Sequence, residues 1–196
     1  MGHVVLFHSV YGLRPAVLTA ADRLRAAGHQ VTTPDLYGRP PVDTVEEGFA
    51  LLAAVGQDEV LRRARAAVDP LPPDTVLAGW SMGAGVAGAL LAERPHTAAL
   101  LLLHGTGGDP AGVRAGLPVQ LHLADPDGYE PPDELDEWRR AMTDAGARLE
   151  VFRYPGAGHL FTDPDVPDHD PVAAERTWQR MLAFLPAGQP TGPAAA

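Results

Sequence analysis

Strand-like segments alternate along the chain with segments of helical spacing. The strand-like segments cover residues 3–7, 30–35, 74–79, 97–105, 118–125 and 147–156. Most of them are short, nearly continuous apolar runs, which is typical of strands buried on both faces. Between them, apolar residues recur every three or four positions, which predicts helices over 15–28, 44–68 with a break near Gly56, 82–94, 132–146 and 170–185.

This order of elements predicts an α/β fold. Parallel strands need crossover connections, and a helix after nearly every strand supplies them. We therefore expect a doubly wound, mostly parallel sheet of about six strands, forming one domain over residues 1–185. No long insertion points to a large lid. The Pro-, Gly- and Ala-rich segment 186–196 is expected to be a disordered tail.

Composition narrows the classes of function. The chain has 196 residues, 45% hydrophobic content and a net charge of −10, which argues against nucleic acid and anionic membranes as partners. It contains no cysteine and no lysine, so a thiol nucleophile and a Schiff-base lysine are excluded. We expect no cofactor and no bound metal. No apolar run reaches the roughly 18 residues of a membrane span, and the N-terminus lacks signal-peptide features, so we expect a cytoplasmic protein.

Two motifs overlap in the stretch GWSMGAGVAG, residues 79–88. Starting at Gly79 it reads G-x-S-x-G, the strand-to-helix turn that presents a nucleophilic serine. Starting at Gly83 it reads G-x-G-x-x-G, the dinucleotide-binding turn, which should follow its strand directly and precede an acidic residue by about twenty positions. Trp80, Ser81 and Met82 intervene, and the sequence near residue 103 is LLLLHG. The pattern favours the nucleophile, with Gly85 and Gly88 letting the helix pack closely on the sheet.

The partners of such a serine follow it in a set order. In this type of fold an acidic residue comes after a later strand and a histidine after the last strand. Here Asp125 and Asp127 follow one predicted strand, and His159 follows the next. Each could be an ordinary loop residue, but together, in this order, they favour nucleophilic catalysis. The order alone does not choose between Asp125 and Asp127.

Two acidic stretches are weaker candidates for metal sites. DPDGYEPPDE, from Asp125, is similar to a calcium loop but lacks the third acidic residue before its glycine. DPDVPDHD, residues 163–170, could also hold a metal. A solvated, proline-rich loop is the better interpretation of this second stretch.

Four segments carry a resemblance to a known family. PDLYGR after the second strand, GWSMGAG at the turn, PVQLHLADPD and YPGAGHLF together resemble the dienelactone hydrolase family of α/β-hydrolases, from Val4 to about Leu185. PDLYGR is the most family-specific of the four. The resemblance implies an α/β-hydrolase fold, a catalytic triad of Ser81, His159 and Asp127 rather than Asp125, and an oxyanion hole formed by the backbone N–H groups of Val10 and Met82.

The chain departs from the founding dienelactone hydrolases at three positions. They have a cysteine where this chain has Ser81, and a glutamate that gates the thiol where it has Ser9. They also place an arginine, which holds a substrate carboxylate, where this chain has Asp163. The first two differences agree with each other, because a serine needs no thiol gate. The third favours neutral substrates over dienelactone itself.

We therefore expect a serine hydrolase that cleaves a small ester or lactone through an acyl-enzyme. Residues in the same loops are candidates for the substrate pocket, although each could equally serve loop packing: His8, Tyr11, Tyr37, Arg39 and Phe161. A lyase, isomerase or cyclase of small lactone-like metabolites, or a non-catalytic binding protein, could use the same fold. The oligomeric state stays open.

Overall fold

A computed structural model describes residues 2–185, and the expected tail, 186–196, lies outside the described residues. The strands are β1 (His3–Phe7), β2 (Gln30–Thr32), β3 (Val76–Trp80), β4 (Leu100–Leu103), β5 (Pro118–Asp125) and β6 (Arg148–Pro155). The helices are α1 (Pro15–Ala26), α2 (Val45–Val55), α3 (Gln57–Val68), α4 (Met82–Ala89), α5 (Pro132–Asp144) and α6 (Pro171–Phe184), with short 3-10 turns η1 (Leu91–Glu93) and η2 (Pro110–Gly112).

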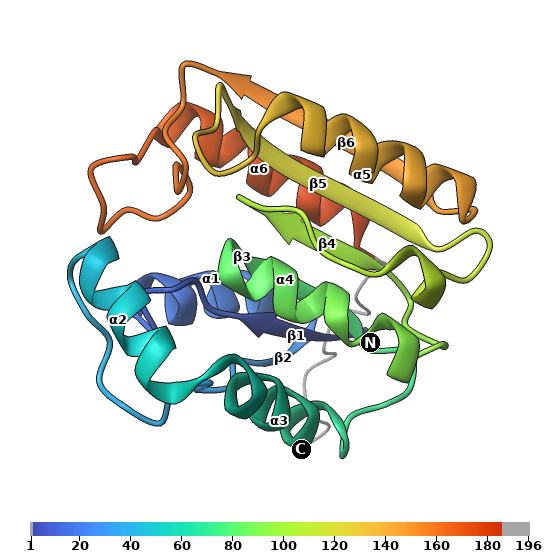
Figure 1. The fold of residues 1–196 in the computed structure, drawn as a ribbon, viewed down its shortest axis with the longest axis horizontal. Coiled ribbons are helices and arrows are strands. Elements are labelled where there is room, and N and C mark those ends of the chain that lie inside the picture. Colours follow the sequence, from blue (N-terminus) through green and yellow to red (C-terminus); the bar gives the residue numbers. More distant parts are fainter. Residues whose placement is uncertain (1, 186–196) are drawn as a thin grey trace, which may run out of the picture.

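The strands form one sheet in the order β2-β1-β3-β4-β5-β6, and every pairing is parallel (Figure 1). The predicted α/β fold with six parallel strands is confirmed. Chain order reverses direction at β1, where β2 lies on one side and β3 on the other. The loops that follow β1 and β3 therefore lie side by side at the carboxyl edge of the sheet, which is where sites form in such folds.

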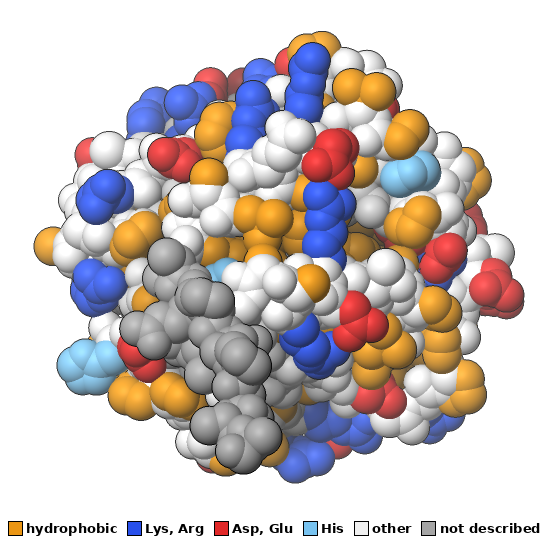
Figure 2. All heavy atoms as spheres, turned by 180° about the vertical axis from the view of Figure 1, so that it is seen from behind, with side chains coloured by type: hydrophobic (Ala, Val, Ile, Leu, Met, Phe, Trp, Pro, Cys, Tyr) orange, Lys and Arg blue, Asp and Glu red, His pale blue; other side chains and the backbone are white. Residues whose placement is uncertain are grey.

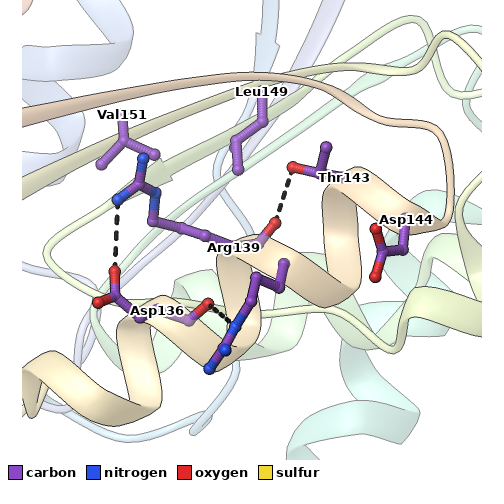
Figure 3. Close-up of a pocket in the computed structure, with 7 residues that line it drawn as sticks. Asp136, Arg139, Thr143, Asp144, Leu149 and Val151 are labelled. Carbon is purple, nitrogen blue, oxygen red and sulfur yellow. Dashed lines mark hydrogen bonds and ion pairs between the residues drawn. The ribbon is translucent and has the colours of Figure 1, made fainter.

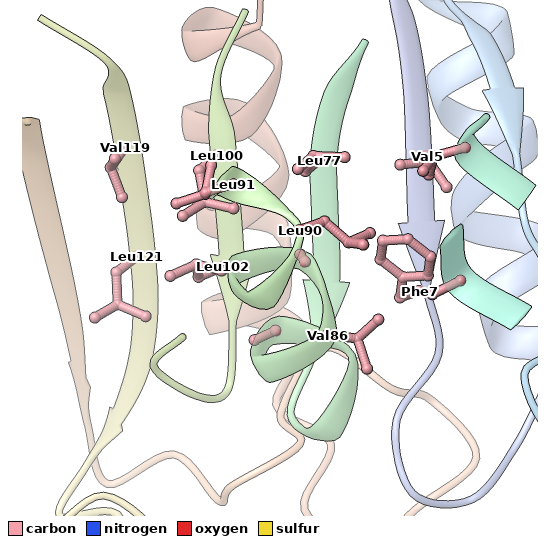
Figure 4. Close-up of a cluster of buried hydrophobic side chains, with 14 of the residues drawn as sticks. Val5, Phe7, Leu77, Val86, Leu90, Leu91, Leu100, Leu102, Val119 and Leu121 are labelled. Carbon is pink, nitrogen blue, oxygen red and sulfur yellow. The ribbon is translucent and has the colours of Figure 1, made fainter. Parts of the chain in front are cut away.

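Alternate residues of each central strand point to opposite faces of the sheet. Val5 and Phe7 pack with α3, α4 and α5 on one face. Figure 4 shows them beside Val86 of α4 and apolar side chains of β3, β4 and β5. Val4 and Leu6 pack with α1 and α6 on the other face. Both faces of the sheet are thus buried, which explains why the strand sequences are almost continuously apolar.

Three local features refine the predicted elements. The helical segment over 44–68 is two helices, broken at Gly56, whose φ of 85° is a conformation that glycine adopts at little cost. Thr44 and Glu47 form a capping box at the start of α2. The helix expected over 82–94 ends at Ala89 and tightens into η1, as helix ends often do.

The surface mixes charges of both signs. Seen from the side opposite to Figure 1, basic and acidic side chains are interspersed across the face (Figure 2). No helix among residues 2–185 is long and apolar enough to cross a membrane.

Candidate active site

Ser81 lies on a sharp turn between β3 and α4. Its φ of 50° and ψ of −112° are unusual for a residue with a side chain. A Cβ atom at Gly79 would lie 2.0 Å from the carbonyl oxygen of Gly83, and one at Gly83 would lie 2.4 Å from that of Phe7. The turn can therefore form only with glycine at both positions, which is the physical basis of the G-x-S-x-G pattern.

A chain of hydrogen bonds connects Ser81 to the two loops after β5 and β6. The Ser81 Oγ lies 2.9 Å from the Nε2 of His159, and the Nδ1 of His159 lies 2.9 Å from both carboxylate oxygens of Asp127. The Asp127 side chain is 2% exposed and that of His159 is 13% exposed. A carboxylate only accepts hydrogen bonds, so the Nδ1 of a neutral His159 carries the ring proton. The lone pair of Nε2 then faces the Ser81 hydroxyl.

Asp125 occupies a different environment from Asp127. Its carboxylate forms an ion pair with Arg153 of β6 at the surface, and its carbonyl oxygen accepts the N–H of Gly156. The Asp127 side chain is buried, and its Oδ1 also accepts the N–H of Tyr129 at 3.0 Å. The structure thus brings Asp127, and not Asp125, to the imidazole of His159.

The two backbone N–H groups expected to form an oxyanion hole belong to Met82 of α4 and to Val10. Met82 is the first residue of α4, where N–H groups have no intrahelical acceptor, and Val10 lies in the loop after β1. Among the described residues, neither N–H group donates to a protein acceptor. The positive end of the α4 dipole also points to this region. Both N–H groups are therefore available to an anionic oxygen.

Three of the five pocket candidates are inside the protein. His8, Tyr37 and Phe161 are 0%, 1% and 0% exposed. His8 accepts the N–H of Leu36 at Nε2 and bonds the Ser9 carbonyl oxygen through Nδ1. In this conformation these three side chains support the loops and have no contact with open surface.

Tyr37 contacts both segments that carry the free N–H groups, the loop after β1 and the start of α4. Its hydroxyl donates to the Val10 carbonyl oxygen and lies 3.1 Å from the sulfur of Met82. Burial raises the pKa of Tyr37 to about 12, so the hydroxyl keeps its proton. Tyr11 and Arg39 are the pocket candidates that do reach the surface.

The acid in place of the family's arginine is compensated. Asp163 is 1% exposed and faces the guanidinium of Arg14 at 3.8 Å, and it also accepts the N–H of Asp165. Burial raises the pKa of the Asp163 carboxyl. Asp163 therefore does not repel a substrate through an exposed charge. Its consequence is that the arginine with which founding members bind a substrate carboxylate is missing at this position.

Sequence reasoning missed several residues around the triad. Glu130 accepts from both the N–H and the hydroxyl of Thr106, so it joins the Asp127 loop to the loop after β4. Burial raises the pKa of Glu130. The ring of Tyr129, 55% exposed, lies 4.5 Å from the ring of His159. Their positions at the carboxyl ends of strands were the only sequence signal available.

A second histidine lies beneath His159. His104 is fully buried, has a φ of 62°, and its Nε2 lies 2.6 Å from the hydroxyl of Thr162. Burial lowers the pKa of His104 well below its usual value. A neutral His104 places no positive charge against an imidazolium on His159.

Several hollows are lined by residues other than Ser81, His159 and Asp127. One of about 530 Å³ lies between α5 and β6, where Arg139 and Asp136 pair beside Leu149 and Val151 (Figure 3). A groove of about 230 Å³ separates α4 from α2 and α3 and includes Met82. No group of three or more His, Asp or Glu residues in the part of the chain that the structure describes could hold a metal ion.

Comparison with known proteins identifies the family of this chain. The model of the dienelactone hydrolase family matches residues 2–188. A carboxymethylenebutenolidase of Rhodococcus opacus is 26% identical over 204 residues, covering 93% of this chain and 79% of that protein. A relative from Escherichia coli (strain K12) is 25% identical over 210 residues, covering 93% of this chain and 75% of its own length.

Solved structures share the fold. A dienelactone hydrolase-like promiscuous phosphotriesterase from metagenomic libraries superposes with a TM-score of 0.79 at 21% identity, covering 94% of this chain and 85% of its own. A thermophilic esterase of Thermogutta terrifontis, with propionate bound, gives 0.69 at 17% identity, covering 93% and 82%. The chain has the α/β-hydrolase fold and belongs to the dienelactone hydrolase family, the hydrolases of esters and lactones.

Proposed function

We propose that this protein is a serine hydrolase that cleaves a small ester or lactone through an acyl-enzyme on Ser81. The observation that carries the proposal is the continuous hydrogen-bonded chain from the Ser81 Oγ through His159 to Asp127. Such a chain supplies a nucleophile, its general base and the group that orients the base. Membership of the dienelactone hydrolase family supports the same chemistry.

In the first half-reaction, the Ser81 Oγ attacks the ester carbonyl carbon while its proton moves to the Nε2 of His159. The carbonyl electron pair shifts to oxygen, and the N–H groups of Val10 and Met82 stabilise the oxyanion. The carboxylate of Asp127 holds the Nδ1 proton and stabilises the imidazolium. As the carbonyl re-forms, the C–O bond to the alcohol breaks, and that oxygen takes the Nε2 proton.

In the second half-reaction, water replaces the alcohol. His159 takes a proton from the water as its oxygen attacks the acyl carbon, and the same two N–H groups receive the new oxyanion. The bond to the Ser81 Oγ then breaks, and the serine regains a proton from Nε2. The products are an acid and a free enzyme. A neutral His104 below the imidazole favours both proton transfers, because it adds no positive charge beside His159.

The preferred substrates are proposed to be neutral. The position where founding members of the family hold a substrate carboxylate with arginine carries Asp163, and its charge faces Arg14 inside the protein. Glu130 places a further carboxyl close to Asp127 and His159. A competitive panel should therefore show neutral esters and lactones reacting faster than carboxylate-bearing ones. A dienelactone carboxylate as the best substrate would contradict this preference.

The proposal is tested by labelling with a fluorophosphonate and mapping the adduct by mass spectrometry. We expect one adduct, on Ser81, and a loss of esterase activity on the order of ten-thousandfold or more in Ser81→Ala. Iodoacetamide should leave activity intact, because the chain has no cysteine. An adduct on another residue, or an active Ser81→Ala variant, would overturn the proposal. Trapping of the acyl-enzyme also separates hydrolysis from a lyase or cyclase reaction, in which no acyl group is carried by Ser81.

A further inference from the structure

The groove between α4 and the α2–α3 pair starts at Met82, the residue after the candidate nucleophile. On its α4 side it is lined by Met82, Gly85, Val86 and Ala89. These positions are spaced as one face of a helix. Met82 directly follows Ser81, and Ala89 lies about 10 Å further along the helix axis. The groove therefore runs from the Ser81 end of α4 to its far end.

The opposite wall is formed by α2 and α3, and α2 also packs against the loop that carries the N–H group of Val10. A Cβ atom at Gly48 of α2 would lie 2.9 Å from the carbonyl oxygen of Val10, so the first half of α2 packs directly against the Val10 loop. One turn later Leu52 of α2 lines the groove, followed by Val60 and Leu61 of α3. The Val10 loop thus packs against the helix that forms one wall of the groove, and Met82 belongs to the other wall.

Gly85 keeps this groove open. Glycine inside a helix is unfavourable relative to alanine, and the neighbouring glycines of α4 have a packing reason. A Cβ atom would lie 2.4 Å from a backbone oxygen at Gly83 and 2.0 Å from the N atom of Gly108 at Gly88. At Gly85 a Cβ atom would meet no atom within 4 Å. The sequence predicted that Gly85 and Gly88 both let this helix pack closely. That explanation holds for Gly88, which packs against the loop after β4, but it does not explain Gly85.

We propose that this groove binds the apolar acyl chain of the substrate ester, an inference that rests on the proposed function. Its lining is apolar except for Gln57, and each methylene buried in it adds hydrophobic binding energy that can be used in the transition state. A volume of about 230 Å³ is less than the roughly 300 Å³ at which pockets for drug-sized ligands begin. The occupant is therefore a chain of short to medium length.

The test compares kcat/KM for the p-nitrophenyl esters of acetate, butyrate, hexanoate and octanoate. For the wild type we expect kcat/KM to rise about twofold to fourfold per added methylene until the groove is full. Gly85→Leu fills the middle of the groove and should lower the hexanoate-to-acetate ratio at least tenfold. Ala89→Leu blocks the far end, so its effect should begin at a longer chain than that of Gly85→Leu.

Ala53→Leu is the matched control, because Ala53 is exposed on α2 outside the groove. It adds the same side chain and should keep the wild-type ratios. A flat wild-type profile, or ratios that Gly85→Leu and Ala89→Leu leave unchanged, would overturn the inference. If Gly85→Leu fails to fold, the chain-length effect of Ala89→Leu decides.

Fluorophosphonate labelling separates this inference from the proposed function. Labelled Ser81 with unchanged ratios would reject the acyl groove and retain the serine hydrolase. Absence of labelling on Ser81 in the wild type would reject the proposed function and, with it, the groove.

Discussion

In the turn that carries Ser81, backbone packs against backbone, whereas the loops that carry Asp127 and His159 are held by side chains. Gly79 and Gly83 allow contacts that any Cβ atom would prevent. On the other side of the site, Glu130 bonds Thr106, and the hydroxyl of Thr162 bonds His104. The position of the nucleophile thus depends on the absence of side chains at these two glycines. The positions of the acid and the base depend on specific polar partners. Substitutions in the two regions should fail in different ways.

The largest expected effect is chemical, in the side-chain region. Asp127→Asn should lower kcat for ester hydrolysis by about ten-thousandfold while the protein remains folded, because the amide no longer selects the Nδ1–H tautomer of His159. Asp125→Asn is the matched control. It removes an exposed ion pair with Arg153, which contributes about 1 kcal/mol or less, and should stay active. An inactive Asp125→Asn variant beside an active Asp127→Asn variant would reverse the proposed assignment.

The next largest effect is on folding, in the backbone region. Gly83→Ala should lower the free energy of unfolding by about 3 kcal/mol, because its Cβ atom would lie 2.4 Å from the carbonyl oxygen of Phe7. Gly85→Ala, two residues along the same helix, meets no atom within 4 Å and should raise stability by about 0.5–1 kcal/mol. Urea unfolding measures both. Equal effects would mean that helix propensity, and not backbone contact, controls this turn.

A third effect concerns a buried histidine of β5. Burial lowers the pKa of His122 to about 3, while its Nδ1 accepts the hydroxyl of Tyr154 and its Nε2 donates to Gln120. Below pH 6.5 the unfolded chain binds a proton there that the folded protein does not, so stability falls as the pH falls towards 3. The loss from this group should be about 2 kcal/mol at pH 5.

His122→Gln removes this titration and should flatten the decrease in stability between pH 7 and 5. Glu130 and Asp163, whose pKa values are raised by burial, act in the opposite direction, because the folded state then holds their protons more tightly. Comparing the variant with the wild type at each pH cancels their contribution. Parallel curves for the two proteins would show that His122 does not titrate differently on folding.

The smallest expected effect tests the bond between Glu130 and Thr106. Glu130→Ala should lower kcat about tenfold, because the Asp127 loop loses two hydrogen bonds, worth about 1 kcal/mol each, that position it. Glu130→Gln keeps an acceptor for the Thr106 N–H and should recover most of the activity. If both variants lose activity equally, the charge of Glu130 matters rather than its hydrogen bonds. The pH profile of kcat then distinguishes the two roles.

Much of the fold could be predicted because its causes are local. Strands buried on both faces must be apolar along their whole length, and helices between them must have one apolar face. Both patterns can therefore be recognised from the spacing of apolar residues along the sequence. Helix ends were harder, as the helix expected to reach residue 94 ends at Ala89. The hydrophobic pattern continues through Leu90 and Leu91 into η1, and spacing alone does not show a change of helix type.

The site was predictable only in part. The G-x-S-x-G pattern predicts a strained turn, because the need for glycine beside the serine is steric and local. The acceptors of His8 and Tyr37, by contrast, come from loops far away in the sequence. The sequence does not distinguish a tyrosine that faces a substrate from one that, like Tyr37, donates its hydroxyl to the carbonyl oxygen of Val10.

The sequence by itself determined the alternation of elements, the strained turn at Ser81, and the order in which serine, acid and histidine follow their strands. The family resemblance selected Asp127 over Asp125, but only the tertiary structure shows that Asp127 meets His159 while Asp125 pairs with Arg153 at the surface. Only the tertiary structure, too, decided that Asp163 faces Arg14. The physical reason is range. Backbone sterics and periodicity act between near neighbours, whereas burial and charge pairing depend on residues that only the folded sheet brings together.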